Sequence, residues 1–271
     1  MSLLNYLMLV KRFKSSNFFD LNIGGVKVQN VAPLGNLLTP GITKAGRLSF
    51  SGYVGSRKVK IYSAFSVDQI ALRVDISNFG FEKFCFPEVV AHDEFFIVEE
   101  WINGCVLNDK ESGKVISNII NELHEAKTNF DGCESGFCYL QDYLLERLSR
   151  WLIVPEIRIF ADRWSELYEE KAHLLEKKIF HPDLNRRNIV VCSQSKKPYV
   201  IDNELFGFGR GWIIDHRNAG LDRSQDLSCF DADLVKFSDI TWCLRRLGSL
   251  MDSCYYSEAV ALIRASGCLY E

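Results

Sequence analysis

Hydrophobic and polar residues follow a strand-like pattern along the first hundred positions, in short runs separated by glycines. The run Lys58–Phe65 alternates polar and apolar side chains, as a half-buried strand does. Similar runs cover Val26–Val31 and Arg47–Tyr53, and two more, Glu88–His92 and Phe95–Trp101, are separated by a short polar turn. This part of the chain is therefore predicted to be rich in β-strands.

One segment in this region, Ser66–Ser77, fits either a strand or a helix. Its apolar residues also recur at helical spacing, and Ser66 is a candidate N-cap. The pattern alone leaves both interpretations open.

From about Lys114 the apolar residues recur every three or four positions, which indicates amphipathic helices. The stripes are Val115, Ile119, Leu123 and Ala126; then Tyr143, Leu144, Leu148, Trp151 and Leu152; and finally Leu234, Phe237, Ile240, Leu244, Leu247 and Met251. Pro155 ends the second helix, and a β-rich stretch interrupts the helices at residues 179–215. We expect an α+β fold with a small β-rich domain, residues 1–101, and a larger, mainly helical domain, residues 102–271.

Composition excludes several classes of protein. With 271 residues, 47% of them hydrophobic and 25% charged, the chain is long and apolar enough for a globular fold of about two units. A net charge of −3 gives no basic surface for nucleic acid. The nine cysteines form an odd set without a C-x-x-C pair, which is typical of reduced thiols in the cytoplasm.

The N-terminal apolar stretch, Ser2–Val10, is too short to span a membrane. Its positive charges, Lys11, Arg12 and Lys14, follow the apolar run, whereas a secretion signal has them in front. No transmembrane segment is expected. Peripheral contact with a membrane is an alternative to a helix that packs on its own domain.

The residues with the clearest chemistry lie between positions 181 and 204. Two apolar runs, Ile189–Cys192 and Tyr199–Ile201, predict a hairpin, with Asn188 entering one strand and Asp202 leaving the other at the same edge. Asp183 lies five residues before Asn188. Two carboxylates and a carboxamide supply oxygen ligands for Mg²⁺ and leave one carboxylate to act as a base.

This arrangement resembles a known fold family. His181-x-Asp183-x-x-x-x-Asn188, followed by a strand that ends in Asp202, resembles the catalytic and metal loops of the protein-kinase-like fold. The ending Ile-Asp-Asn-Glu204 is similar to that of aminoglycoside phosphotransferases and choline kinases, and Asp183-Leu-Asn-Arg-Arg-Asn188-Ile resembles a loop of lipopolysaccharide-core sugar kinases. The resemblance covers about residues 85–205.

The resemblance implies a bilobal kinase-like fold and transfer of the γ-phosphate of ATP, with Mg²⁺, to a hydroxyl of a small acceptor. That acceptor would be a sugar, an aminosugar or a lipopolysaccharide-core compound. Asp183 would be the catalytic base, and Asn188 and Asp202 would hold Mg²⁺. Glu99 and Trp101 would offer main-chain groups of the hinge to the adenine.

Kinases of this fold also need a lysine on the third strand and an acidic partner from the next helix. Lys60 fits the lysine, and Asp75 is its predicted partner. The alternative alignment makes Arg73 the phosphate-binding cation. Gly41-Ile-Thr-Lys-Ala-Gly46 is a candidate for the turn that covers the phosphates.

Several features keep other functions open. Asn185 replaces the lysine of Ser/Thr kinases and no Ala-Pro-Glu occurs, which disfavours protein substrates but leaves an atypical protein kinase or a pseudokinase scaffold as alternatives. His181-Pro-Asp183 is also the tripeptide of J-domain co-chaperones, although strands rather than basic helices follow it here. The acidic cluster Asp222, Asp226, Asp231 and Asp233 is either a site for a cationic acceptor or a solvated helix start.

Overall fold

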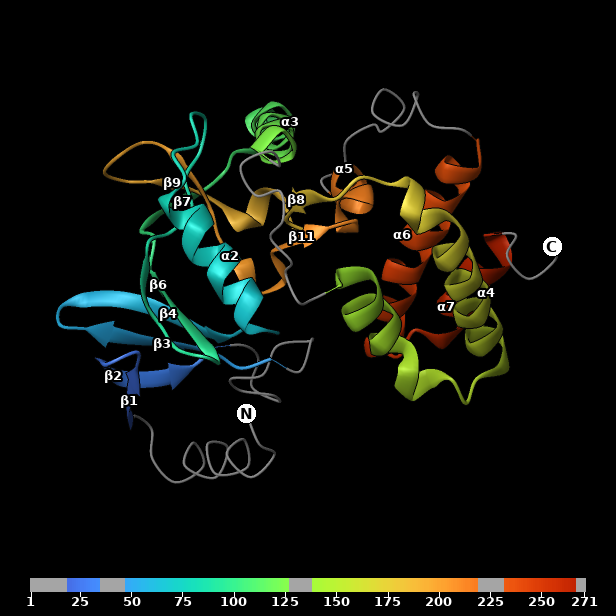
Figure 1. The fold of residues 1–271 in the computed structure, drawn as a ribbon, viewed down its shortest axis with the longest axis horizontal. Helices are drawn as coiled ribbons and strands as arrows, with labels where there is room; N and C mark the ends of the chain where they lie inside the picture. The colour runs from blue at the N-terminus through green and yellow to red at the C-terminus, as the bar shows by residue number, and fades with distance from the viewer. Residues whose placement is uncertain (1–18, 35–46, 127–137, 219–231, 267–271) are drawn as a thin grey trace. The chain divides into compact units, whose positions relative to one another are not determined.

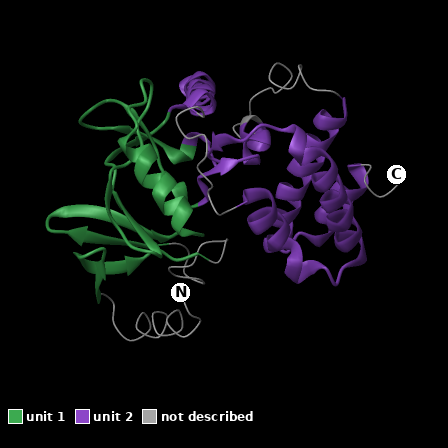
Figure 2. Cartoon of the chain, in the orientation of Figure 1, with its two compact units in different colours: residues 1–107, 134–136, 187–204 green, residues 108–133, 137–186, 205–271 purple. Residues whose placement is uncertain are grey.

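The computed structural model of the chain describes residues 19–34, 47–126, 138–218 and 232–266. The chain forms two compact units, each assembled from separate stretches of sequence (Figure 2).

The division between the two units differs from the single boundary expected from the sequence. Unit 1 contains residues 1–107, 134–136 and 187–204, and unit 2 contains the remainder. The first crossing, after residue 107, lies close to the expected boundary at residue 101. The hairpin segment 187–204, however, belongs to the β-rich unit and not to the helical one.

A six-stranded sheet forms most of unit 1 (Figure 1). In sequence order the strands are β1 (Phe19–Ile23), β2 (Val26–Pro33), β3 (Ser49–Val54), β4 (Arg57–Ser63), β5 (Val89–His92) and β6 (Phe96–Glu100). They lie in the order β1-β2-β3-β4-β6-β5, and each neighbouring pair is antiparallel. Gly24 and Gly25 form the two-residue turn between β1 and β2, where φ values of 55° and 80° favour glycine.

The side chains of β4 alternate between two environments. Val59 and Ile61 are fully buried in the core on one face of the sheet. Tyr62 points to the other face, where it packs with Ile70 of helix α2. Since successive strand residues point to opposite faces, Lys60 shares the face of Tyr62, on the side of α2.

Helix α2 (Val67–Asn78) settles the segment that fitted either a strand or a helix. The Ser66 hydroxyl caps it by accepting a hydrogen bond from the Gln69 backbone N–H at 3.0 Å. The buried residues of the helix are Gln69, Ile70, Leu72, Arg73 and Ile76.

A second, three-stranded sheet in unit 1 explains why the hairpin belongs there. Its order is β10-β9-β7, from β7 (Gly104–Val106), β9 (Ile189–Cys192) and β10 (Pro198–Val200). Cys85 also donates from its backbone N–H to the Pro198 carbonyl at 2.9 Å. A Cβ atom on Gly104 would lie 2.1 Å from the Val191 carbonyl oxygen, so only glycine fits where β7 meets β9.

Unit 2 is mainly helical. Its helices are α3 (Asp109–Glu125), the π-helix η2 (Tyr139–Leu145), the 3₁₀-helix η3 (Glu146–Trp151), α4 (Pro155–Lys171), η4 (Ala172–Leu174), η7 (Gly211–Ile214), α5 (Asp215–Asn218), α6 (Ala232–Asp252) and α7 (Tyr256–Ala265). A small sheet pairs β8 (Lys178–Phe180) with β11 (Gly207–Gly209). Two short turns, η5 (Arg186–Asn188) and η6 (Asn203–Leu205), occur where the chain passes from one unit to the other.

The core of unit 2 forms around α6, which lies beside α4 and α7 (Figure 1). Leu244 and Leu247 of α6 are completely buried. The Trp164 indole N–H of α4 donates to the Thr241 hydroxyl at 3.1 Å, which satisfies a buried polar group.

The mixed architecture confirms the predicted α+β class and most predicted elements. The predicted helix through Tyr143–Leu152 is instead a π-helix followed by a 3₁₀-helix, a difference that apolar spacing does not resolve. Strand β1 and helix α7 were not predicted. None of the described helices combines the length and the apolar character needed to cross a membrane. The apolar stretch Ser2–Val10 and the glycine turn Gly41–Gly46 lie outside the described residues.

Candidate functional site

In unit 1, Lys60 forms ion pairs with two carboxylates that follow strand β10. Its Nζ atom lies 2.6 Å from Asp202 Oδ1 and 2.8 Å from Glu204 Oε1. The side chains of Lys60 and Glu204 are only 16% and 10% exposed, whereas that of Asp202 is 44% exposed. Charge-assisted contacts of this kind fix the lysine side chain and leave the Asp202 carboxylate accessible.

The partners of Lys60 keep its charge in spite of burial. Burial opposes the ammonium charge, but Glu204 and Asp202 outweigh it and raise the pKa of Lys60. Burial also raises the pKa of Glu204 to about 7, although Lys60 opposes that shift. Ser49 donates from its hydroxyl to Glu204 Oε1 at 3.2 Å and holds the carboxylate in place.

Of the two candidate phosphate-binding cations, Lys60 lies beside Asp202, whereas Arg73 lies beside Glu99. Arg73 Nε donates to Glu99 Oε1 at 2.7 Å, and Nη2 donates to the Pro87 carbonyl at 2.9 Å. The side chains of Arg73 and Glu99 are 1% and 2% exposed. Arg73 is thus held inside unit 1 as the partner of a buried carboxylate.

The structure does not join Asp75 to Lys60. Asp75 lies on the exposed side of α2, and Lys60 takes its acidic partners from the segment after β10. The side chain that α2 turns toward that segment is Gln69, whose Nε2 donates to the Glu204 carbonyl at 3.3 Å. The predicted pair of Lys60 with Asp75 is therefore not formed, and the acids that Lys60 contacts, Asp202 and Glu204, come from a distant part of the sequence.

The hinge residues are engaged within unit 1. The Trp101 backbone N–H donates to the Lys58 carbonyl at 3.1 Å, and the Glu100 N–H donates to the Glu88 carbonyl at 2.9 Å. The Glu99 side chain is buried in the contact with Arg73, whereas the resemblance implied a role for its main-chain groups only. An adenine at this segment would therefore use main-chain groups other than these two N–H donors.

The predicted hairpin is present and brings Asn188 next to the end of β10. Ile189 pairs with Val200, and the Ile201 N–H donates to the Asn188 carbonyl at 2.9 Å. Asn188 and Asp202 therefore lie at the same end of the hairpin, as the spacing predicts.

The backbone of Asp202 is in the left-handed region, with φ of 67°. Such a conformation is uncommon for a residue other than glycine and persists only where the surroundings hold it. The next residue, Asn203, is 1% exposed, and its amide donates to the Val200 carbonyl at 3.3 Å and to Glu99. These hydrogen bonds, which the Asn203 amide donates, hold the backbone in the turn that contains Asp202.

Asp183 belongs to unit 2 and has a cationic partner there. Arg245 of α6 donates from Nη2 to Asp183 Oδ1 and from Nη1 to the Tyr139 hydroxyl, the latter at 2.7 Å. His181, two residues before Asp183, is completely buried, and its carbonyl accepts the Leu184 N–H at 2.9 Å. The sequence did not predict Arg245, because nothing in the α6 pattern sets it apart from neighbouring basic residues.

The donor set at the hairpin end suits Mg²⁺. This ion commonly binds one or two carboxylates together with substrate phosphates. Asp202 offers a carboxylate and Asn188 an amide oxygen, both hard ligands. Within the described ranges no group of three or more His, Cys, Asp or Glu side chains could hold a metal by itself, so an ion here would also need phosphate oxygens.

No family model and no curated protein matches the sequence, whereas solved structures do. A thermostable mutant of aminoglycoside phosphotransferase APH(4)-Ia matches with a TM-score of 0.54 and 12% identity, covering 95% of this chain and 96% of that chain. Choline kinase LicA from Streptococcus pneumoniae matches with a TM-score of 0.53 and 13% identity, covering 97% and 100%.

A putative fructosamine-3-kinase from Thermobifida fusca matches with a TM-score of 0.52 and 14% identity, covering 90% of this chain and 95% of that chain. The chain has the protein-kinase-like fold of small-molecule kinases. A further structure of the phosphotransferase, with a TM-score of 0.51 to this chain, is a complex with AMP-PNP and hygromycin B. The predicted fold is confirmed, and at these identities the likeness concerns the fold alone.

Proposed function

We propose that this chain transfers the γ-phosphoryl group of ATP, with Mg²⁺, to a hydroxyl group of a small acceptor such as a sugar or an aminosugar. The observation that carries the proposal is the ion pair between Lys60 and Asp202, at the same end of the hairpin as Asn188. The shared fold with aminoglycoside, choline and fructosamine kinases supports it. The AMP-PNP complex of the phosphotransferase supports ATP as the nucleotide.

In this proposal the residues of unit 1 hold the nucleotide phosphates. Lys60 contacts the phosphates, and its pairs with Asp202 and Glu204 hold the ammonium in position before ATP binds. Asn188 and Asp202 hold Mg²⁺, which when bound supplies positive charge to the phosphate oxygens. The contribution of these residues is positioning and charge neutralisation.

Asp183 of unit 2 acts on the acceptor. It orients the acceptor hydroxyl and accepts its proton as that oxygen bonds to the γ-phosphorus. The bond between the γ-phosphorus and the bridging oxygen breaks, and its electron pair leaves with ADP. We place this reaction in the cytoplasm, which supplies ATP and keeps thiols such as Cys85 and Cys192 free.

The test combines ATP binding with turnover in wild type, Asp183→Asn, Asp202→Asn and Lys60→Met. We expect Mg²⁺-ATP to raise the melting temperature of the wild type and of Asp183→Asn, but not of Asp202→Asn or Lys60→Met. All three variants should lose at least about 100-fold in phosphate transfer. Asp75→Asn, an exposed carboxylate of α2, is the matched control and should behave as wild type.

Two outcomes would contradict this proposal. A wild-type protein that shows no Mg²⁺-dependent ATP binding cannot be a kinase of this kind. Binding without turnover to any of a set of sugars, aminoglycosides, choline-like amines and proteins would instead favour the pseudokinase scaffold.

A further inference from the structure

The Asp183 carboxylate shares its site with a cation from its own unit. Arg245 donates to Asp183 through one terminal nitrogen and to the Tyr139 hydroxyl through the other. The Arg245 side chain is 14% exposed and that of Asp183 is 34% exposed. The Arg245 side chain is therefore the more buried of the two, and the Asp183 carboxylate is the more accessible to solvent.

The positive charge of Arg245 is permanent. Burial opposes it, but Tyr139 and Asp183 outweigh burial and raise the pKa of Arg245. Burial also raises the pKa of the Tyr139 hydroxyl, so Tyr139 stays neutral and serves as a hydrogen-bond acceptor. The Arg245 guanidinium therefore offsets the negative charge of the Asp183 carboxylate that it contacts.

The other buried carboxylates described in unit 2 also face bases. Asp252 accepts from Arg147 at 2.6 Å, and Asp215 lies 3.5 Å from His124 Nε2. A cationic acceptor needs carboxylates in excess of the protein's own bases, because like charges at close range disfavour binding. Asp183 and Asp252 pair with guanidinium groups, so neither of these carboxylates offers such an excess.

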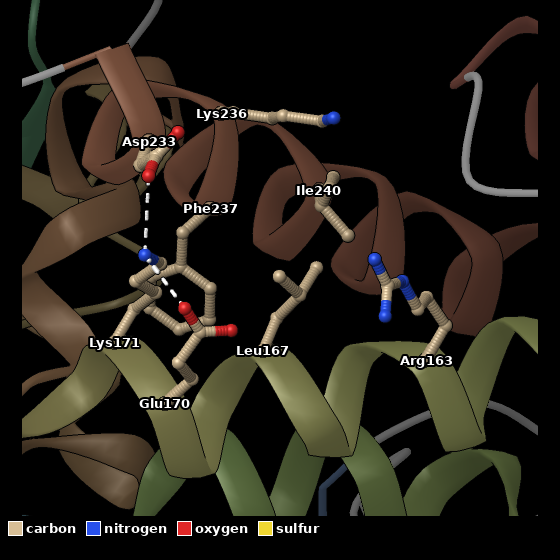
Figure 3. A pocket seen from close by; sticks show the side chains of 8 residues that line it. All are labelled: Arg163, Leu167, Glu170, Lys171, Asp233, Lys236, Phe237 and Ile240. Carbon is tan, nitrogen blue, oxygen red and sulfur yellow. Dashed lines mark hydrogen bonds and ion pairs between the residues drawn. The ribbon is translucent and has the colours of Figure 1, made fainter. Parts of the chain in front are cut away.

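A surface hollow between α4 and α6 likewise has no excess of carboxylates over basic side chains (Figure 3). Its charged lining consists of Arg163, Lys171 and Lys236 against Glu170 and Asp233. Lys171 lies 2.8 Å from Glu170 and 3.1 Å from Asp233. Asp233 is the one member of the predicted acidic cluster that the structure describes, and the ion pair with Lys171 offsets its negative charge. The other members, Asp222, Asp226 and Asp231, lie outside the described residues.

We propose that Arg245 sets the class of acceptor, so that the hydroxyl delivered to Asp183 belongs to a neutral or anionic sugar and not to a cationic aminosugar or a choline-like amine. This inference rests on the proposed function and narrows its acceptor. Arg245 acts here as a specificity and positioning residue, while Asp183 accepts the proton. An ammonium group beside the reacting hydroxyl would meet the guanidinium that already occupies the carboxylate.

The experiment measures ADP release from Mg²⁺-ATP, which counts transfer to every acceptor, including water. Compounds are supplied in matched sets that differ in one charge: glucose, N-acetylglucosamine, glucosamine and glucuronate, and the same series on galactose. For the wild type we expect kcat/KM for the neutral or anionic members to exceed that of the ammonium member at least about tenfold. In Arg245→Met this ratio should fall at least about tenfold, and Arg245→Lys should retain most of it.

Controls separate specificity from folding. Arg150→Met removes an exposed arginine of unit 2 that pairs with Asp252 and should leave the ratio unchanged. Tyr139→Phe keeps the ring, releases one side of Arg245 and should move the ratio in the direction of Arg245→Met. Melting temperatures show whether Arg245→Met is folded, and if it is not, Tyr139→Phe and Arg245→Lys carry the test.

The possible failures are distinguishable. The inference is overturned if the wild type has a higher kcat/KM for the ammonium member, or the same kcat/KM for all members of every set. In either case the observed ATP turnover leaves the proposed function standing. A ratio that Arg245→Met does not change also overturns it. Absence of both ATP binding and ADP release in the wild type overturns the proposed function itself.

Discussion

The side-chain amide of Asn203 lies 3.4 and 3.3 Å from the two carboxylate oxygens of Glu99 and donates to both. Asn203 directly follows Asp202, whose backbone has a positive φ, and Glu99 belongs to the interior strand β6. The residue that we propose as a magnesium ligand is therefore anchored, through its neighbour, to an interior strand of the sheet.

Asn203→Ala should loosen this anchor. The change leaves the Glu99 carboxylate with fewer donors and frees the Asp202 turn to relax toward negative φ. We expect a loss of about 1–3 kcal/mol in the free energy of unfolding, since a buried group loses its hydrogen bonds. Mg²⁺-dependent ATP affinity should fall more than metal-free affinity. Urea denaturation and calorimetric titration measure the two effects, and equal losses of affinity with and without Mg²⁺ would contradict the anchoring role.

Glu99→Gln should destabilise unit 1 strongly. It leaves the Arg73 guanidinium buried without a counter-charge, which typically costs about 3–5 kcal/mol. The double variant Arg73→Met with Glu99→Gln removes both charges and keeps an amide oxygen that can accept from Asn203 and from the Tyr62 hydroxyl, which donates to Glu99 Oε1 in the native protein. We expect it to recover most of the lost stability in chemical denaturation. A double variant as unstable as Glu99→Gln would show that the ion pair is not the source of the loss.

Gly104→Ala should detach the hairpin from β7. The new Cβ would lie 2.1 Å from the Val191 carbonyl oxygen, and because that atom belongs to the backbone, a side-chain rotation cannot relieve the overlap. We expect a lower melting temperature and reduced Mg²⁺-ATP binding, because β9 begins directly after Asn188. Gly80→Ala is the matched control, since its Cβ would have no neighbour within 4 Å. Equal behaviour of the two variants in a thermal shift assay would contradict this account.

Stability should fall at alkaline pH because of three buried tyrosines. Burial raises the pKa of Tyr62, Tyr139 and Tyr143 above the ordinary value near 10. A tyrosine whose pKa is higher in the folded state than in the unfolded state stabilises the fold fully at pH values below its unfolded-state pKa. This stabilisation is lost as the pH rises from the unfolded-state pKa toward the folded-state pKa. Each tyrosine should remove about 1.4 kcal/mol per pH unit above about pH 10.

The measurement is urea denaturation between pH 9 and pH 11, together with absorbance of the phenolate. Tyr143→Phe should reduce the slope of the free energy of unfolding against pH by the equivalent of about one proton. Phenolate absorbance from all tyrosines before the protein unfolds would contradict the prediction.

Local patterns predicted the parts of this protein that depend on local interactions. The alternation in Lys58–Phe65 and the turn before Tyr199 gave β4 and the hairpin, because strand period and turn chemistry act over a few residues. The choice of Lys60 as the phosphate-binding lysine followed from the resemblance to a known fold, and periodicity does not show that it lies beside Asp202, 142 residues away.

The partners supplied by tertiary packing were not predictable. Glu204 lies within two residues of Asp202, yet nothing local marks it as the second acid of Lys60 in place of Asp75. Arg245 reaches Asp183 over 62 residues, from a helix whose pattern reports only its apolar face. Arg73 looked like a candidate phosphate ligand because a sequence does not show that Glu99 lies buried next to it.

The distribution of unit 1 over three stretches of sequence has a practical consequence for protein engineering. A fragment that stops at residue 107 keeps all six strands of the large sheet, yet it lacks β9 and β10. Strand β7 would become an open edge, which invites pairing with other chains. Lys60 would lose both carboxylates, and Glu99 would lose Asn203. Unit 1 therefore cannot be excised or grafted by one cut, because its charges balance only when the chain returns to it after about eighty residues spent mostly in the other unit.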